Sequence, residues 1–424
     1  MKRFALALTA LALVVAACGG DDEGAPPPTS TGTTATAPTP STDGTSSSTT
    51  SAPATTQTAP PTSVAREDVA IPVHLQSSVS QWGTDWELRT IDLDTLRVGI
   101  VAADPRDRIA PLDGPGFEST EDAASWLADR EPGVLLVEGE VARFYPLQIL
   151  TLHEIANDRI DGRPVAVTYC PLCNTAIVFD REIEGVTHRF GVSGLLRNSD
   201  LVMWDDVTES LWQQITGEAI VGTYAGRTLE VVPSTLVRFG DARADHPDLE
   251  VLSQDTGFPF PYGVNPYEGY SSSAQPFAFD GEVDPRYPAL ERVVGVTIGD
   301  SSKAYPFPEI REVGAVDDTV GGIPITVWWG AEDTADALDD ATVAEGEGVG
   351  SGVAYLREVG DRVLSFERVD DSTFRDLETG STWNILGTAT DGPLAGERLT
   401  VATHRNEFWF AWTAFFPDAP VYEA

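Results

Sequence analysis

The sequence predicts a β-rich α+β protein, a tandem of two homologous halves that follow a disordered linker. Short runs rich in β-branched and aromatic residues recur along the chain, as in Val165 to Phe179, and such runs favour strands. Residues 67 to 424 are long enough for two domains. The chain also matches itself at a long and nearly constant offset.

The first 18 residues are typical of a lipoprotein signal peptide. Lys2 and Arg3 precede an apolar run from Phe4 to Ala17, and Cys18 follows in a lipoprotein-type cleavage box. The run has about 14 residues, fewer than the roughly 20 that a membrane-spanning helix needs. We therefore expect an extracytoplasmic protein that is anchored to the cell membrane by a lipid on Cys18.

Residues 19 to 66 are almost entirely Thr, Ser, Pro, Ala and Gly, a composition too polar and too rich in proline to bury a core. We expect this segment to be a disordered tether. The chain carries a net charge of −39, so it should repel nucleic acid. Solubility of an exported protein explains this acidity without an acidic binding surface.

The first half begins with a strand-rich lead-in, and its sequence predicts two helices. One covers Glu121 to Asp129. The other is amphipathic and covers Leu147 to Ile160, after a buried strand at Val134 to Val137. On the second helix His153 and Asn157 are four residues apart and would share one face.

Identities between the halves follow one another in order along the chain. They recur at an offset of 160 from Gly139 to Val167, at 171 from Asp205 to Trp212 and at 170 from Gly217 to Val251. So long a period indicates a duplicated domain, because solenoid units repeat every 20 to 50 residues or so. We expect a first repeat domain at residues 67 to 253, a Pro- and Tyr-rich connection at 254 to 290 and a second repeat domain at 291 to 424.

Cys170 and Cys173 are the two cysteines that follow the signal peptide, and they flank a Cys-Pro-Leu-Cys turn between two predicted strands. In the repeat they fall opposite Gly330 and Asp333, so the second half lacks them. A turn that served only to hold this fold together would be expected in both halves. The difference favours a specialised site in the first half, although duplicated loops also diverge without a functional reason.

Seven motifs in a fixed order carry a family resemblance. They are His153-Glu-Ile-Ala-Asn-Asp158, Val167-Thr-Tyr-Cys-Pro-Leu-Cys-Asn-Thr-Ala176, Gly194-Leu-Leu-Arg-Asn-Ser-Asp-Leu-Val-Met203, Ser210-Leu-Trp-Gln-Gln-Ile-Thr-Gly-Glu-Ala219, Asn265-Pro-Tyr267, Gly380-Ser-Thr-Trp383 and Phe408-Trp-Phe-Ala-Trp412. They resemble the bacterial domain-of-unknown-function 3179 family over nearly everything after about residue 95. The family has no established activity. Some members are similar to selenoproteins with selenocysteine in the cysteine turn, which implies redox chemistry there.

The first interpretation of the turn is a thiol/disulfide redox site. Cys170 and Cys173 would be the reactive pair, and His153 would act as the base. The strand predicted after Cys173 argues against a thioredoxin fold, in which the second cysteine belongs to a helix. Glu154, Asn157 and Tyr169 are expected to surround the pair and bind there.

Two other interpretations stay open. In one, Cys170, Cys173 and His153 are ligands of copper or zinc. In the other, the cysteines form a permanent disulfide in a non-catalytic binding or scaffold module, although so small a ring restricts the unfolded chain only slightly. The sequence assigns neither a reaction nor a substrate or protein partner.

Two further polar segments are candidate binding residues. Arg197 and Asn198 lead into a turn that ends at Asp200, and this turn either contacts a polar substrate or is closed by an internal salt bridge. Gln213 and Gln214 follow Trp212, a predicted core residue. The aromatic run from Phe408 to Phe416 is predicted to be a strand buried on both faces. The chain has no Walker loop, dinucleotide fingerprint, Gly-X-Ser-X-Gly elbow or His-Glu-X-X-His motif.

Overall fold

A computed structural model of the protein describes residues 69–424. The predicted signal peptide with Cys18 and the predicted linker at residues 19 to 66 lie outside the described residues. Within residues 69–424 the fold is β-rich, as predicted, because 29 strands accompany six α-helices, none longer than seven residues. In the same part of the chain no helix is long and apolar enough to cross a membrane.

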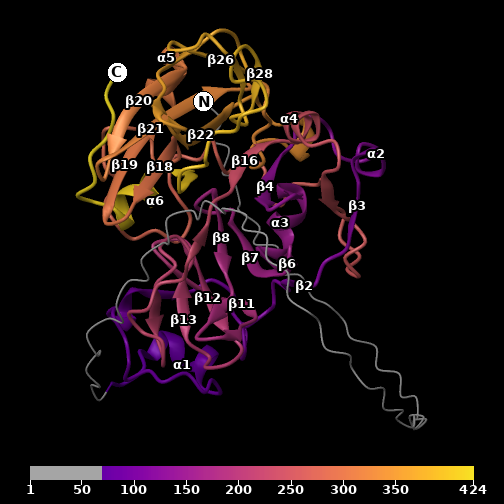
Figure 1. Cartoon of the computed structure of the whole chain (residues 1–424). Helices are drawn as coiled ribbons and strands as arrows, with labels where there is room; N and C mark the ends of the chain where they lie inside the picture. The colour runs from indigo at the N-terminus through magenta and orange to yellow at the C-terminus, as the bar shows by residue number, and fades with distance from the viewer. Residues whose placement is uncertain (1–68) are drawn as a thin grey trace, which may run out of the picture. The chain divides into compact units, whose positions relative to one another are not determined.

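A five-stranded sheet holds the cysteine turn (Figure 1). In sheet order its strands are β15 (Val231–Val232), β8 (Thr175–Asp180), β7 (Arg163–Cys170), β6 (Ile155–Ile160) and β2 (Leu112–Asp113). Nearly every residue of β6, β7 and β8 is buried. Burial on both faces explains why β7 and β8 contain apolar runs, Val165 to Val167 and Ala176 to Phe179, instead of alternating polar and apolar residues.

Two more five-stranded sheets and a hairpin complete the first half. One sheet has the order β16 (Thr235–Arg238), β4 (Pro132–Glu138), β5 (Val141–Pro146), β17 (Glu250–Leu252) and β3 (Phe117–Ser119). The other has the order β1 (Leu96–Val98), β11 (Phe190–Arg197), β12 (Asp200–Asp205), β13 (Leu211–Gln213) and β14 (Ala219–Val221). The hairpin consists of β9 (Glu182–Ile183) and β10 (Val186–Thr187).

The second half contains three smaller sheets and a hairpin. Their strands, in sheet order, are β19 (Ser301–Pro306), β18 (Arg292–Ile298) and β29 (His404–Phe408); β20 (Ala315–Val320), β21 (Ile323–Gly330) and β22 (Ser351–Leu356); and β25 (Phe366–Arg368), β26 (Thr373–Asp376), β27 (Thr382–Asn384) and β28 (Ala389–Asp391). The hairpin consists of β23 (Glu358–Val359) and β24 (Arg362–Val363).

Short helices join these strands. They are α1 (Val73–Val79), α2 (Thr120–Ala123), α3 (Leu147–His153), α4 (Phe239–Asp245), α5 (Phe307–Val313) and α6 (Trp409–Phe415), with 3-10 turns η1 (Leu93–Thr95) and η2 (Val343–Glu345). The helix predicted for residues 121 to 129 is therefore reduced to the single turn of α2.

The helix predicted for residues 147 to 160 is wrong in its second half. α3 ends at His153 because Glu154 adopts a left-handed conformation, with φ 58°, and β6 begins at Ile155. β6 then pairs with β7 along its whole length, and this pairing outweighs the helical spacing of the apolar residues. His153 and Asn157 consequently do not share a helix face.

The aromatic run from Phe408 to Phe416 is not a strand. Phe408 ends β29, and Trp409 to Phe415 form α6, in which Trp409, Phe410, Ala411 and Trp412 are all buried. A helix that is apolar on every side has no polar face to reveal its period, so its sequence resembles that of a buried strand.

The two halves share an order of elements. β4, β5, α3, β6, β7 and β8 follow one another in the first half, and β18, β19, α5, β20, β21 and β22 do so in the second, with antiparallel pairing in both. In each half an aspartate at the end of a strand, Asp205 of β12 or Asp376 of β26, accepts a hydrogen bond from a tryptophan indole at 2.9 Å. The common origin of the halves stays a prediction.

Candidate functional site

The two cysteines lie at the end of the β7–β8 hairpin. Cys170 ends β7 and pairs with Thr175, the first residue of β8. A strand, not a helix, therefore follows Cys173, as predicted. Both thiols are buried, at 2% and 0% exposure, and they form no disulfide.

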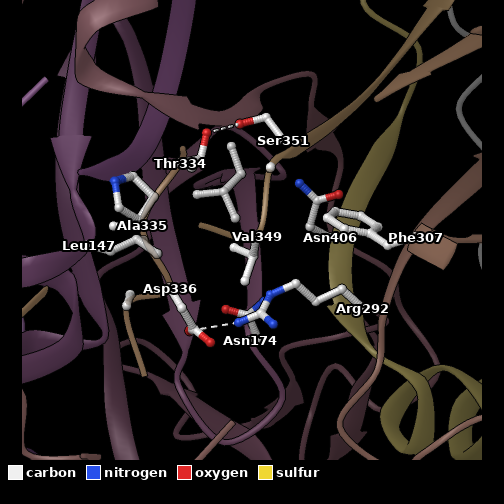
Figure 2. Close-up of a pocket in the computed structure, with 14 residues that line it drawn as sticks. Leu147, Asn174, Arg292, Phe307, Thr334, Ala335, Asp336, Val349, Ser351 and Asn406 are labelled. Carbon is white, nitrogen blue, oxygen red and sulfur yellow. Dashed lines mark hydrogen bonds and ion pairs between the residues drawn. The ribbon is translucent and has the colours of Figure 1, made fainter. Parts of the chain in front are cut away.

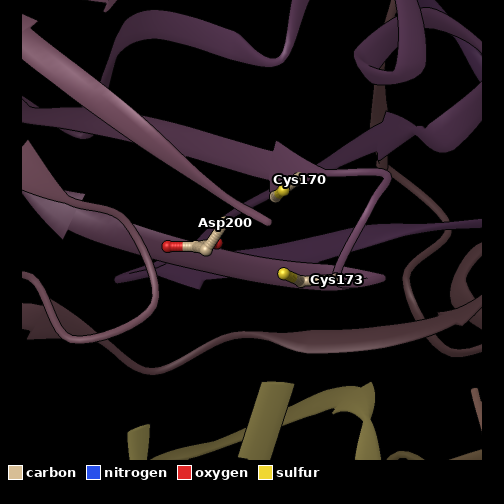
Figure 3. A group of neighbouring side chains, drawn as sticks. All are labelled: Cys170, Cys173 and Asp200. Atoms are coloured by element: carbon tan, nitrogen blue, oxygen red, sulfur yellow. The ribbon is translucent and has the colours of Figure 1, made fainter. Parts of the chain in front are cut away.

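Asp200 is the third member of the site. The two sulfur atoms and a carboxylate oxygen of Asp200 all lie within 4.8 Å of one another, and the three side chains converge in Figure 3. Asp200 is fully buried. Across residues 69–424 no other group of three or more His, Cys, Asp or Glu side chains brings its ligand atoms this close together. We refer to Cys170, Cys173 and Asp200 as the Cys2Asp cluster.

Hydrogen bonds hold one oxygen of the Asp200 carboxylate. Oδ2 accepts from the side-chain amide of Gln213 at 2.6 Å and from the backbone N–H of Ile215 at 2.9 Å. The guanidinium of Arg197 donates in turn to Gln213 Oε1 at 3.3 Å. Oδ1 of Asp200 is buried and has no hydrogen-bond partner within the described residues. The carboxylate is thus oriented through one oxygen, and the two thiols are its other polar neighbours.

Burial disfavours negative charge throughout the cluster. It raises the pKa of Asp200 to about 6, although hydrogen bonds from Ile215, Gln213 and the two thiols oppose the rise. It also raises the pKa of the Cys170 thiol and raises that of Cys173 well above its ordinary value. In the absence of a cation, the site therefore favours protonated thiols.

A fourth acidic side chain, Glu154, lies next to the cluster. It follows α3, is 7% exposed, and its carbonyl oxygen accepts the backbone N–H of Tyr169 at 2.7 Å. Burial and then the negative charge of Asp200 raise the pKa of Glu154 to about 8. The charge of Glu154 also contributes to the raised pKa of Cys170.

The connection at residues 254 to 290 lies over the cysteine turn. The hydroxyl of Tyr270 donates to the carbonyl oxygen of Leu172 at 2.9 Å and accepts the N–H of Phe277 at 3.3 Å. The hydroxyl of Ser199, next to Asp200 in the chain, donates to the carbonyl oxygen of Phe277 at 2.5 Å. These hydrogen bonds tie the connection to both parts of the Cys2Asp cluster.

The structure does not place His153 in the cluster. Its Nδ1 contacts the carbonyl oxygen of Ala110 at 2.7 Å, its Nε2 contacts the hydroxyl of Tyr262 at 2.6 Å, and its ring packs against Phe258 and Phe260. Both ring nitrogens are thus engaged elsewhere. His153 thus joins α3 to the connection, and its role as a base or ligand for the thiols stays a prediction.

Asn157 and Tyr169 also make structural contacts. The Asn157 amide donates to the carbonyl oxygen of Phe190 at 2.7 Å and accepts the N–H of the same residue at 2.9 Å, which joins β6 to β11. The hydroxyl of Tyr169 donates to the side chain of Asn174, the residue after Cys173, at 3.1 Å. Tyr169 therefore holds the cysteine turn through Asn174, and Asn157 connects the sheet that contains β6 to the sheet that contains β11.

The polar residues predicted to bind a ligand lie in different surroundings in the structure. Asn198 lies in the β11–β12 turn with φ 50°, and Gln214 donates to Thr168 Oγ1 at 2.9 Å, beside the hairpin. Arg197 does not form the internal salt bridge that was one expectation for this turn. Its guanidinium instead donates to Gln213 and lies over the ring of Phe415.

Asp200 is the site residue that sequence reasoning missed. It had a place in the predicted turn, but only as a partner for Arg197. The available signal was an aspartate at the head of the apolar run Asp200-Leu-Val-Met203, where β12 is almost entirely buried. Burying a carboxylate in such an apolar run is unfavourable unless hydrogen bonds or a cation compensate its charge.

A small cavity adjoins the turn on the side of Asn174 (Figure 2). Arg292 and Asp336 form an ion pair of 2.6 Å in its wall, and Asn406 contributes a buried Oδ1 that has no partner within the described residues. Its volume of about 30 Å³ holds a few water molecules at most. The cavity is therefore too small for an organic substrate.

The model of the family DUF3179, described as a protein of unknown function, matches residues 106–419. The chain belongs to the DUF3179 family. The match contains the whole Cys2Asp cluster and confirms the resemblance inferred from the motifs, while α1 and β1 precede it. No curated protein and no solved structure matches this DUF3179 protein.

Proposed function

We propose that this DUF3179 protein binds a divalent transition-metal ion of the zinc type through Cys170, Cys173 and Asp200. One observation supports this most directly. The carboxylate of Asp200 is buried against two thiols, one of its oxygens is held by Gln213 and Ile215, and the other has no partner. A cation is the group that best offsets three buried acids.

The donor set favours zinc among the common metals. Zinc binds thiolate sulfur at about 2.3 Å and carboxylate oxygen at about 2.0 to 2.2 Å, so two sulfurs of a tetrahedral site lie about 3.8 Å apart. The two sulfur atoms lie within 4.8 Å of each other, so a shift of about 1 Å would bring them to that separation. Copper(I) prefers soft ligands alone, and a carboxylate is a hard donor.

In metal sites, a ligating carboxylate is commonly oriented by hydrogen bonds from residues that do not bind the metal themselves. Partners behind a ligand fix its orientation, and their loss typically costs metal affinity. Arg197 and Gln213 fill this role for Asp200. Arg197 and Gln213, which the sequence predicted to bind a ligand, thus orient Asp200, a proposed metal ligand.

Thiol/disulfide exchange is the second candidate, favoured by the proximity of two free thiols to a carboxylate that could accept a proton. Against it stand full burial and the raised thiol pKa values, because the thiolate is the nucleophile. The scaffold interpretation has less support, since the cysteines form no disulfide.

Metal content provides the test. The chain carrying Cys18→Ser, which removes the residue predicted to be lipidated, should be purified under reducing conditions and examined by elemental analysis. We expect about one equivalent of zinc, and a sulfur-to-cobalt charge-transfer band after exchange with Co²⁺. Cys170→Ser, Cys173→Ser and Asp200→Asn should each lose most of the zinc while circular dichroism stays unchanged. Metal-free protein that takes up neither ion at micromolar concentration would refute the proposal.

We also propose that the chain is an extracytoplasmic lipoprotein anchored to the membrane through Cys18, and that its halves arose by duplication. The signal-like N-terminus supports the first proposal, and the shared order of elements supports the second. Membrane fractionation after labelling with a fatty acid tests the anchor, since Cys18→Ser should release the protein from the membrane.

A further inference from the structure

The backbone carbonyl oxygen of Ser199 lies beside the Cys2Asp cluster. Ser199 and Asn198 form the two-residue turn between β11 and β12, in which Arg197 pairs with Asp200. Both turn residues are left-handed, with φ 68° for Ser199 and 50° for Asn198, as a tight hairpin turn requires. The Cys170 thiol donates to Ser199 O across a sulfur–oxygen distance of 3.9 Å. A direct contact therefore places this oxygen at the first cysteine.

The Ser199 oxygen loses its hydrogen-bond donor when the thiol ionises. Ser199 is 0% exposed, and within residues 69–424 the Cys170 thiol is the donor that reaches its carbonyl. Metal binding requires the thiolate, so the proton of Cys170 would be released. The oxygen lone pairs then face a negatively charged sulfur, which is unfavourable in a buried site unless a cation lies between the two atoms.

The sulfur–oxygen distance suits two donors of one ion. Zinc binds sulfur at about 2.3 Å and oxygen at about 2.0 to 2.2 Å, so a thiolate and an oxygen of one tetrahedral site lie about 3.6 Å apart. The distance between Cys170 Sγ and Ser199 O is 3.9 Å, which a shift of about 0.3 Å would bring to that value.

Hydrogen bonds hold both neighbouring oxygens of this turn. The hydroxyl of Ser199 donates to Phe277 O at 2.5 Å, so the hydroxyl is engaged by the connection and the carbonyl is the group that contacts the thiol. Asp200 Oδ2 is held by Gln213 and Ile215. Consecutive residues thus offer a carbonyl oxygen and a carboxylate to the cysteine turn.

We propose that the carbonyl oxygen of Ser199 is the fourth donor to the ion held by the Cys2Asp cluster, and that it closes the site to added ligands. This inference rests on the proposed function. Catalytic zinc keeps one position for water or substrate, whereas zinc with four protein donors has a structural role. The protein would therefore hold its ion without using it to activate water.

Isotope labels isolate the Ser199–Asp200 peptide group, because this is the one place in the chain where aspartate follows serine. Protein labelled with ¹³C at the serine carbonyl and ¹⁵N in aspartate gives a single coupled carbonyl resonance. In the Cys18→Ser background, loading with ¹¹³Cd²⁺ in place of zinc should split or broaden this resonance through coupling to the metal. Loading with spinless ¹¹⁴Cd²⁺ is the control and should leave the resonance narrow.

Two variants test whether the turn aims the carbonyl. Ser199→Gly and Ser199→Val both lose the hydroxyl, but a β-branched residue opposes the left-handed conformation that glycine adopts freely. Competition titration should show zinc bound about 10-fold more weakly by Ser199→Val than by Ser199→Gly. Circular dichroism establishes that both variants are folded, and the isotope comparison decides alone if Ser199→Val is not.

A closed site also resists added anions. The visible spectrum of the Co²⁺-substituted protein should not change with azide, which coordinates at open positions.

If the protein binds cadmium but its resonance is equally narrow with both isotopes, the inference about Ser199 is overturned and the proposed function survives. An azide-dependent Co²⁺ spectrum or equal zinc affinity in the two folded variants has the same consequence. So does complete loss of zinc in Ser199→Gly, because the hydroxyl would then be the donor. A protein that binds neither zinc nor cadmium overturns both proposals.

Discussion

The carbonyl oxygen of Cys173 accepts a hydrogen bond from the backbone N–H of Phe408 at 2.9 Å. Phe408 is the last residue of β29, which pairs with β18 of the second half. The cysteine turn is therefore fixed from two directions, by the β7–β8 hairpin of its own half and by a strand far away in sequence. A metal site needs such rigid support, because ligand geometry sets affinity.

Gln213→Leu should weaken zinc binding by roughly 10- to 100-fold, because Asp200 Oδ2 would keep only the hydrogen bond from Ile215. Competition titration measures the effect. Gln214→Leu is the neighbouring control. It removes hydrogen bonds to Thr168 and Thr175 and should lower stability without a comparable loss of zinc affinity. Equal zinc affinity in wild type and Gln213→Leu would contradict the orienting role.

His153→Gln should retain a full equivalent of zinc, because both nitrogens of His153 are engaged by Ala110 and Tyr262. The free energy of unfolding should fall by about 1 to 3 kcal/mol, since the substitution disturbs two buried hydrogen bonds. Elemental analysis and urea unfolding measure the two effects separately. A zinc-free His153→Gln protein with normal stability would restore His153 as a ligand.

The thiols of metal-free native protein should react with a thiol reagent more slowly than free cysteine does. Burial raises the pKa of both cysteines, and each unit of that rise removes about tenfold of the reactive thiolate. Reaction progress followed by mass spectrometry should show both cysteines modified rapidly only after denaturation. A single fast-reacting cysteine at pH 7 would favour the redox candidate over the metal site.

Glu407 should make the stability of metal-free protein depend on pH. Burial, partly offset by Arg405, raises its pKa from 4.5 to about 7. The folded state favours the protonated form of Glu407. Its contribution to the free energy of unfolding is therefore complete below pH 4.5 and is lost as pH rises through 7. The stability of wild type relative to Glu407→Gln should decline by about 3 kcal/mol across this range. Parallel urea-unfolding profiles for the two proteins between pH 4 and 8 would contradict the assignment.

Tyr270→Phe should release zinc to a chelator about fivefold faster than wild type. The substitution removes the hydrogen bond to Leu172 O, worth about 1 kcal/mol, and so favours local opening of the connection over the buried cluster. Zinc content at equilibrium should stay the same. Identical stopped-flow release rates would mean that the ion leaves by another route.

The hairpin was predictable because it depends on local chemistry. β-Branched and aromatic residues on both sides of Cys170-Pro-Leu-Cys173 specify two strands and a tight turn, whatever packs around them. The end of α3 was not predictable from spacing alone. The apolar residues from Leu147 to Ile160 fit a helix, but pairing with β7 decides the second half of that stretch.

By itself the sequence determined the β-rich class, the family and the choice of the two cysteines as candidate site residues. All three depend on composition and on short motifs, which are local features of the chain. Only the tertiary structure decided which groups surround the thiols. It turned His153 toward Tyr262, and it placed Asp200, the first residue of β12, beside the thiols. The reason is physical. Distances between residues from different strands follow from sheet pairing and burial, which no local pattern encodes.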